Sequence, residues 1–306
     1  PCVMTAGLAI GATLHLRHDD LTVVHASRGF FGRLRVYERS GVSREGGRPV
    51  MRKTRTIAHG YTLHGLQFQG DRASLPTTYF TPRSGVGTAI RYLRAVVTPE
   101  RQKNGERVRI GVIGLGAGTL AAYAFDCDDF RFYEIQPAVI DAAERDFTFL
   151  AAARERGANV ETVLGDARIQ LERELEGSGS HKFDLLVVDA FSSDAIPKHL
   201  LTKECVELYW KHLRADGLLA IHITNRFLDL LPVVRGLADA SGKRLLYFTN
   251  IDELATATRR AMWVVLTSNE IFLSEKHGAQ YATPSGSTKK PILWTDDFSS
   301  LWHVLR

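Results

Sequence analysis

The sequence predicts an α/β fold in which a mostly parallel sheet carries helices on both faces and follows a small antiparallel β domain. Residues 21–69 alternate between apolar and polar side chains in runs separated by glycine and polar clusters, which is typical of antiparallel strands. From Val108 onward, strand and helix patterns alternate, which is typical of a parallel sheet. An apolar run followed by a glycine-rich turn, residues 114–118, opens this second region.

The composition is that of an ordinary globular protein. The chain has 306 residues, 44% hydrophobic and 24% charged, so it can bury a sizeable core. The 39 basic residues only mildly exceed the 34 acidic ones, and several stand in the polar segments 43–55 and 98–109, which we interpret as solvated loops. We therefore expect no nucleic-acid partner. The three cysteines are too few and scattered for a disulfide framework or a zinc site, and we expect no metal.

We divide the chain into three parts. In residues 1–20, the apolar stretch is shorter than the roughly 20 residues that a membrane-spanning helix needs, so we interpret the segment as a linker or the end of a removed hydrophobic region. Residues 21–86 form the predicted small β domain. Residues 87–306 form the predicted α/β domain, which begins with a helix over 87–97.

The elements of the larger domain follow from local patterns. The apolar run 108–113 predicts its first strand, and a helical pattern follows the glycine turn. After strand 130–134, Pro137 suits the first turn of a helix. Residues 183–188 are apolar except at Asp184, as expected of a strand buried on both faces. The remaining elements are strand 160–164, a charged helix ending in the loop 177–180, helix 202–213, strand 217–224, a helix containing Pro232, and strands 244–249 and 262–267.

Four polar positions fall at the carboxyl ends of successive predicted strands: the turn at Gly114, then Glu134, Asp166 and Asp189. Ligands of open parallel sheets bind outside those ends. Taken singly, Asp166 could cap a helix and Asp189 could be a loop acid. Four such positions in register favour a ligand site.

The spacing of these residues indicates an adenosine-containing ligand. Glu134 lies 20 residues after Gly114, where a carboxylate can accept both ribose hydroxyls. Asp166 with the Ala167 amide would offer an acceptor and a donor to the adenine edge, and Asp189 could accept a proton from an attacking amine. The turn reads GxGxG and not GxGxxG, which favours adenosyl-sulfonium compounds over nicotinamide cofactors.

The motifs at 114–118, 133–137, 164–167 and 187–194 resemble the spermidine synthase (polyamine aminopropyltransferase) family. Further phrases, at 28–32, 59–67, 79–87 and 295–298, resemble the spermidine-synthase-like domain that is fused to a multi-pass, transporter-like membrane region. The resemblance implies a methyltransferase-like (Rossmann-type) fold and S-adenosylmethionine or its decarboxylated form as co-substrate. It also implies a small-molecule amine as partner, pairing with a second copy, and a parent protein tethered at the cytoplasmic side of a membrane.

The resemblance also assigns roles to single residues. It implies catalytic roles for Asp189 and Asp194. It implies a cofactor site formed by Gly114, Gly116, Ala117, Gly118, Glu134, Asp166, Ala167 and Gln67. It implies an acceptor site that includes His64, Tyr79, Asp296 and Asp297.

Two departures from the family pattern concern charge. The family turn carries an acid where this chain has Ala117, and an Asp-Glu pair precedes the family's pocket tyrosine where this chain has Pro76-Thr77-Thr78. Because an acid would repel the α-carboxylate of intact S-adenosylmethionine, we hypothesise that Ala117 permits use of the intact compound. Asp296 and Asp297 could cap a helix beginning at Phe298 or could supply the missing acids.

Three functions remain open from the sequence. The first is amine attack on the carbon next to the sulfonium, which releases methylthioadenosine. The second uses intact S-adenosylmethionine, either for methyl transfer or for internal breakdown to methylthioadenosine. The third is a non-catalytic sensor that binds the nucleoside. From the residues alone, His59 and His64 are interpreted as ordinary strand residues, although the resemblance favours His64 as a site residue, and His222 is interpreted as a core histidine.

Overall fold

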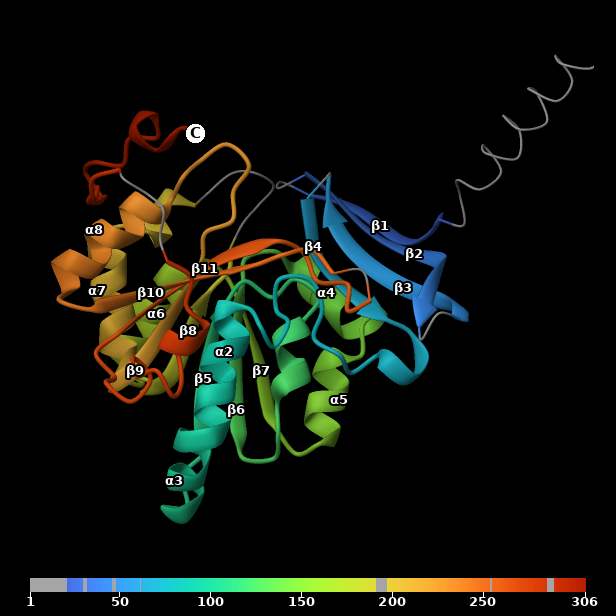
Figure 1. The fold of residues 1–306 in the computed structure, drawn as a ribbon, viewed down its shortest axis with the longest axis horizontal. Helices are drawn as coiled ribbons and strands as arrows, with labels where there is room; N and C mark the ends of the chain where they lie inside the picture. The colour runs from blue at the N-terminus through green and yellow to red at the C-terminus, as the bar shows by residue number, and fades with distance from the viewer. Residues whose placement is uncertain are drawn as a thin grey trace, which may run out of the picture.

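The computed structural model describes residues 21–29, 32–45, 48–60, 62–190, 197–253, 255–284 and 289–306. The predicted linker at 1–20 lies outside these residues. Two sheets organise the described part of the chain, one of four strands and one of seven (Figure 1).

The four-stranded sheet is antiparallel, and its strands follow one another in chain order. The strands are β1 (Leu21–Gly29), β2 (Gly32–Glu45), β3 (Arg48–His59) and β4 (Thr62–Phe68). The interpretation of 43–55 as a solvated loop is wrong, because β2 and β3 remain paired from Leu34 opposite His59 to Glu45 opposite Arg48. Pairing between the two backbones satisfies their polar groups, so a polar sequence can extend as a hairpin.

The seven-stranded sheet has the order β10-β11-β9-β8-β5-β6-β7. Its bounds are β5 (Val108–Ile113), β6 (Asp128–Glu134), β7 (Asn159–Leu164), β8 (Phe183–Val188), β9 (Leu213–His222), β10 (Arg244–Asn250) and β11 (Ala261–Thr267). The five strands β5 to β9 are parallel to one another, and β11 runs antiparallel to both of its neighbours. The predicted fold class is therefore confirmed.

Helices cover both faces of this sheet (Figure 1). One face carries α2 (Gly85–Tyr92), α4 (Pro137–Asp146) and α5 (Phe149–Glu155), and the other carries α6 (Ala167–Gly177), α7 (Lys203–His212) and α8 (Leu231–Ser241). Side chains of β8 alternate between the two cores, with Leu185 and Val187 in the first and Leu186 and Val188 in the second. This strand is buried on both faces, as its sequence predicts.

Two expectations about local structure need correction. Residues 98–109 are not all loop, because α2 continues through a π-helical turn, η2 (Leu93–Val97), into α3 (Thr98–Lys103), where Pro99 occupies the first turn. The helix expected after the glycine turn is only a short 3₁₀ helix, η3 (Thr119–Tyr123).

The small sheet and the large sheet share one core. Leu34, Val36 and Ile57 of the small sheet belong to the same buried cluster as the α4 face of the large one. The segment after β4 contacts both β4 and the connection between β10 and β11, since the Thr77 hydroxyl donates to Leu66 O and the Thr78 amide donates to Ala257 O at 3.0 Å. A domain boundary at residue 86 therefore stays a prediction. Across the described ranges, no helix combines the length and apolar character needed to span a membrane.

Candidate active site

A cavity of about 480 Å³ lies at the carboxyl ends of β5 to β9, and residues of β3, β4 and the segment before α2 also line it. Each of these five parallel strands places a residue on its wall: Gly114, Glu134, Asp166, Asp189 and His222 follow or end β5, β6, β7, β8 and β9. The first four are the positions that the sequence pattern selected. The fifth, His222, was not selected.

The glycine turn requires glycine because other chain segments pack directly onto its backbone. Gly114 has φ +96°, and a Cβ there would lie 2.4 Å from Asp189 O. Gly116 has φ +55°, and a Cβ there would lie 2.3 Å from His64 O. Both glycines line the cavity, so the turn leaves room for a ligand beside its backbone.

The other two predicted turn residues do not line the cavity. Ala117 is buried, and a Cβ added to Gly65 of β4 would meet the Ala117 Cβ at 2.5 Å. Gly118, at φ +76°, faces Leu150 of α5. Position 117 is thus packed under β4. Because its side chain does not contact the cavity, the structure gives no support to the hypothesis that Ala117 permits use of intact S-adenosylmethionine.

Glu134 is buried at the tip of β6, and its carboxylate is fixed by backbone donors. Leu115 N donates to one carboxylate oxygen at 3.1 Å and Gln136 N donates to the other at 2.9 Å. Burial raises the pKa of Glu134, and these backbone hydrogen bonds oppose the rise. Each oxygen keeps further lone pairs for a ligand, which fits the pair of ribose hydroxyls.

Asp166 both caps a helix and lines the cavity, so the structure is compatible with its interpretation as a helix cap and with its interpretation as a site residue. One oxygen accepts from Ile169 N at 3.2 Å at the start of α6, and the other lies 2.8 Å from His199 Nε2. Ala167 lines the cavity beside it. His199, which the sequence did not indicate, also lies in the wall.

Asp189 ends β8 in the middle of the cavity wall. Its Oδ1 lies 2.6 Å from His222 Nδ1, and the Tyr79 hydroxyl forms a second hydrogen bond with the carboxylate. The His222 ring is stacked between Tyr79 at 4.5 Å and Trp263 at 4.8 Å. The apolar strand around His222 suggested a core histidine, but its contact with Asp189 makes it a residue of the site.

The electrostatics of Asp189 are unusual for a carboxylate. Burial raises its pKa, and the charge and hydrogen bond of His222 and the hydrogen bond from Tyr79 oppose this effect only in part. Burial, with the neighbouring Asp189, likewise raises the pKa of Tyr79 well above its ordinary value. A buried carboxyl with a raised pKa is a better proton acceptor than an ordinary aspartate.

The structure brings together some predicted acceptor residues and not others. His64 and Tyr79 line the cavity. Gln67 does not, because its side chain is engaged by Ala73 O, Thr148 Oγ1 and Thr148 N, where it fastens β4 to the start of α5. Asp194 lies outside the described residues.

Asp296 and Asp297 are also absent from the cavity wall. Asp296 instead forms a bidentate ion pair with Arg168, at 2.7 and 2.6 Å. No helix begins at Phe298; the next helical turn is η6 (Trp302–Val304). Neither of the two roles considered for this acidic pair is seen.

Charge is distributed unevenly along the cavity. Its β6–β7 end carries Glu134 and Asp166, whereas its β9–β11 end carries Arg226 and Arg260. His59 and His64 lie along β3 and β4, with ring centroids 5.3 Å apart. Burial lowers the pKa of both, to about 4 for His64, so both imidazoles are neutral at pH 7. Among the described residues, no group of three or more metal-ligating side chains is arranged to hold an ion.

The fold and the site together define a methyltransferase-like α/β protein with a pocket suited to an adenosine-containing ligand. No protein-family model matches the chain. A polyamine aminopropyltransferase from Vibrio vulnificus is 33% identical over 122 residues, a match that covers 39% of this chain and 38% of that protein. The matched region thus spans about two fifths of the relative's length.

The solved structures that are similar to this chain include two named as spermidine synthases. A probable spermidine synthase from Corynebacterium glutamicum has a TM-score of 0.56 at 15% identity, covering 89% of this chain and 90% of that chain. A spermidine synthase from Thermotoga maritima has a TM-score of 0.49 at 13% identity, covering 90% and 82%. The sequence match confirms the predicted resemblance to the spermidine synthase family, and the first structure confirms the fold. Fusion to a transporter-like membrane region stays a prediction.

Proposed function

We propose that the chain is a transferase of the polyamine aminopropyltransferase type, which moves an aminopropyl group from decarboxylated S-adenosylmethionine to an amine. The name of the Vibrio vulnificus relative supports this activity. The cavity supports it too, because acids that can hold an adenosine lie at one end and a buried proton acceptor lies at the middle.

The chemistry follows from this arrangement. Glu134 and Asp166 bind the adenosine, and the cavity wall holds the amine in line with the carbon next to the sulfonium. The amine lone pair forms the new C–N bond while the C–S bond breaks, and its electron pair stays on sulfur as neutral methylthioadenosine. Asp189 accepts the proton that the new ammonium loses.

The observation that carries the proposal is the burial of Asp189 beside the cavity, where a histidine and a tyrosine are its side-chain partners among the described residues. His222 and Tyr79 orient the carboxylate, and stacking of His222 on Trp263 fixes that orientation. Trp263 Nε1 donates to Tyr79 O at 3.0 Å, so the three rings and the backbone support one another. A proton acceptor held in one position raises the rate only for a reactant bound beside it.

Product analysis tests the proposal. The protein is incubated with decarboxylated S-adenosylmethionine or with S-adenosylmethionine, each with and without an amine, and the products are identified by mass spectrometry. Methylthioadenosine that forms only with the amine supports the proposal. S-adenosylhomocysteine would indicate methyl transfer, and methylthioadenosine formed without an amine would indicate internal breakdown. Binding without turnover would indicate a sensor. Each of these results would contradict the proposal.

Attachment to a membrane region at its cytoplasmic side and pairing with a second copy belong to the same proposal. Both rest on the resemblance of the motifs in the sequence. Membrane fractionation of the protein in its native cells and sedimentation of the purified protein would test them separately.

A further inference from the structure

We infer that the β9–β11 end of the cavity binds a carboxylate, so that the reacting pair includes an amino-acid-like group in place of a simple diamine. This inference rests on the proposed function for the reaction itself. It concerns the part of the site that lies beyond Asp189, away from Glu134 and Asp166.

The first observation is a pair of arginines whose guanidinium groups have no acidic partner among the described residues. Arg226 follows β9 and Arg260 precedes β11, so the antiparallel pairing of these strands brings both to the same edge of the sheet. Both line the cavity, and neither guanidinium has a hydrogen bond or ion pair with another described residue. Asp252 accepts only from the backbone amide of Arg260, at 3.0 Å.

An arginine outside the cavity wall is, in contrast, neutralised by an acid. Arg168, near the β7 end, forms its bidentate pair with Asp296. The contrast matters because planar guanidinium groups match carboxylates in geometry as well as charge. Two such groups on a cavity wall therefore provide a site for an anion.

The second observation is that, in the described part of the chain, no acid lines the cavity wall at this end, since Asp252 contacts the Arg260 backbone but is not part of the wall. Asp189 is the nearest acid of the wall, and His222 and Tyr79 already engage it. A diamine would bring a distal ammonium group, which needs a carboxylate to replace its water. Two arginines would repel that ammonium and attract a carboxylate.

The third observation is a buried polar atom that is left for a ligand. His64 lines this cavity beside the Gly116 turn, and its Nε2 is shielded from solvent and has no hydrogen-bond partner among the residues that the structure describes. Because the pKa of His64 is lowered to about 4, the ring is neutral and can donate a hydrogen bond without adding charge. A buried polar atom without a partner costs free energy, which a bound ligand would remove.

The carboxylate could belong to the acceptor amine or to the methionine part of intact S-adenosylmethionine. The experiment therefore pairs two acceptors that differ in one carboxylate, putrescine and ornithine, with both forms of the co-substrate. The protein is compared with the double variant R226Q/R260Q and with R173Q, which removes an exposed arginine of α6 outside the cavity wall. Both cavity arginines are exposed, so their replacement leaves the core intact.

We expect ornithine to have a lower KM than putrescine, or intact S-adenosylmethionine to bind more tightly than the decarboxylated form. In either case the double variant weakens the carboxylate-bearing compound about ten- to hundredfold, and R173Q does not. The charge reversal R260E should shift the preference towards putrescine. The inference would be overturned if ornithine and putrescine had equal KM values and both forms of S-adenosylmethionine bound equally well. It would also be overturned if a preference for the carboxylate-bearing compound remained in R226Q/R260Q.

Failure of the proposed function has a different signature. If no amine yields methylthioadenosine with either co-substrate, the transferase proposal fails. Calorimetric binding of S-adenosylmethionine, its decarboxylated form and ornithine to the same variants still tests the arginine pair, since it does not depend on turnover.

Discussion

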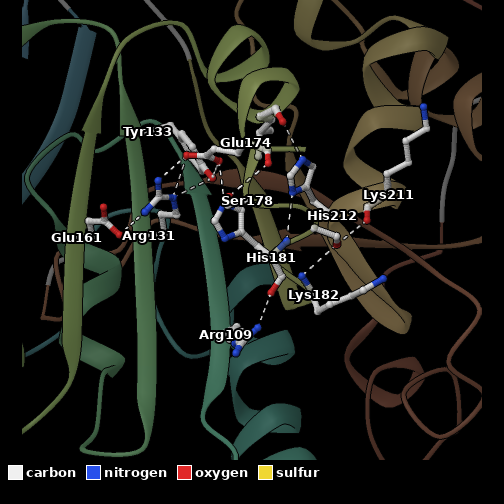
Figure 2. Close-up of polar contacts among 12 residues, drawn as sticks. Arg109, Arg131, Tyr133, Glu161, Glu174, Ser178, His181, Lys182, Lys211 and His212 are labelled. Carbon is white, nitrogen blue, oxygen red and sulfur yellow. Dashed lines mark hydrogen bonds and ion pairs between the residues drawn. The ribbon is translucent and has the colours of Figure 1, made fainter. Parts of the chain in front are cut away.

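Two clusters of this protein, one partly buried and one buried, contain the same three kinds of side chain and differ by one arginine. In one, Glu174 of α6 contacts Tyr133 and His181, and Arg131 of β6 joins them (Figure 2). In the other, Asp189 contacts Tyr79 and His222. No arginine contact with Asp189 is seen among the described residues.

Burial and hydrogen bonding balance differently in the two clusters. Burial alone would raise the pKa of Glu174, but hydrogen bonds from His181, Arg131 and Tyr133 outweigh it and lower the pKa to about 2. For Asp189, the effect of burial is larger than the opposing effects of His222 and Tyr79, so its pKa is raised. The Glu174 cluster is thus charged and satisfied, which is what a structural cluster needs. The Asp189 cluster keeps a carboxylate that can take up a proton, which is what a catalytic cluster needs.

The largest expected effect is the loss of the proton acceptor. In D189N, we expect kcat/KM for methylthioadenosine release to fall about a thousandfold, the usual range for a general base, while the free energy of unfolding is maintained. Stability is kept because burial already disfavours the charged form of this carboxyl. Steady-state kinetics and thermal unfolding measure the two quantities. A rate within twofold of the unmodified protein would remove Asp189 from its catalytic role.

Removal of the Glu174 carboxylate should lower the stability of the protein and leave its reaction rate nearly unchanged, the opposite of D189N. In E174Q, Arg131 loses a partly buried carboxylate partner and keeps Glu161 and the Tyr133 hydroxyl, so we expect unfolding to become easier by about 2 to 3 kcal/mol. The rate of the folded protein should change less than twofold, since Glu174 does not line the cavity. Denaturant unfolding with a parallel assay checks both. A rate that falls as far as in D189N would erase the difference between the clusters.

The pH dependence of the stability of E174Q further distinguishes the two clusters. The pKa of Glu174 is about 2 in the folded protein and near 4.5 when unfolded, so its stabilisation is fully present above about pH 5. It is lost as the pH falls from about 4.5 to 2. The difference in unfolding free energy between the protein and E174Q should therefore be constant from pH 6 to 8 and shrink below pH 5. A difference that grows in acid would assign the stabilisation to another group.

The contrast between the clusters was only partly predictable from the sequence. Glu134, Asp166 and Asp189 could be placed because each follows a clearly patterned strand, and the ends of parallel strands meet at one edge. The same rule applied to β9 would have selected His222, but its apolar neighbours made it look like a core residue. Its partner, Tyr79, followed from the resemblance to a family.

Other residues depended on contacts that no local pattern records. Gln67 was expected at the ligand, yet Thr148, 81 positions away in the chain, engages its amide. Asp296 was expected at the amine, yet Arg168, 128 positions away, takes its carboxylate. The pairing of long-range polar partners is settled by tertiary packing, which strand and helix periodicity do not encode. Arg226 and Arg260 were missed for the same reason.

The smallest expected effect tests the tyrosines as a matched pair. Tyr79→Phe removes a hydrogen bond that lowers the pKa of Asp189, so that pKa should rise further. The acid limb of the pH–rate profile depends on deprotonated Asp189, so it should move to higher pH, while the rate above that limb changes only about threefold. Tyr133→Phe removes the corresponding hydrogen bond to Glu174, 2.7 Å long. It should cost about 1 kcal/mol of stability and leave the pH–rate profile in place. Both rings line the cavity and both variants keep them, so lost packing affects the two alike. If Tyr133→Phe moves the acid limb and Tyr79→Phe does not, the roles assigned to the two carboxylates are reversed.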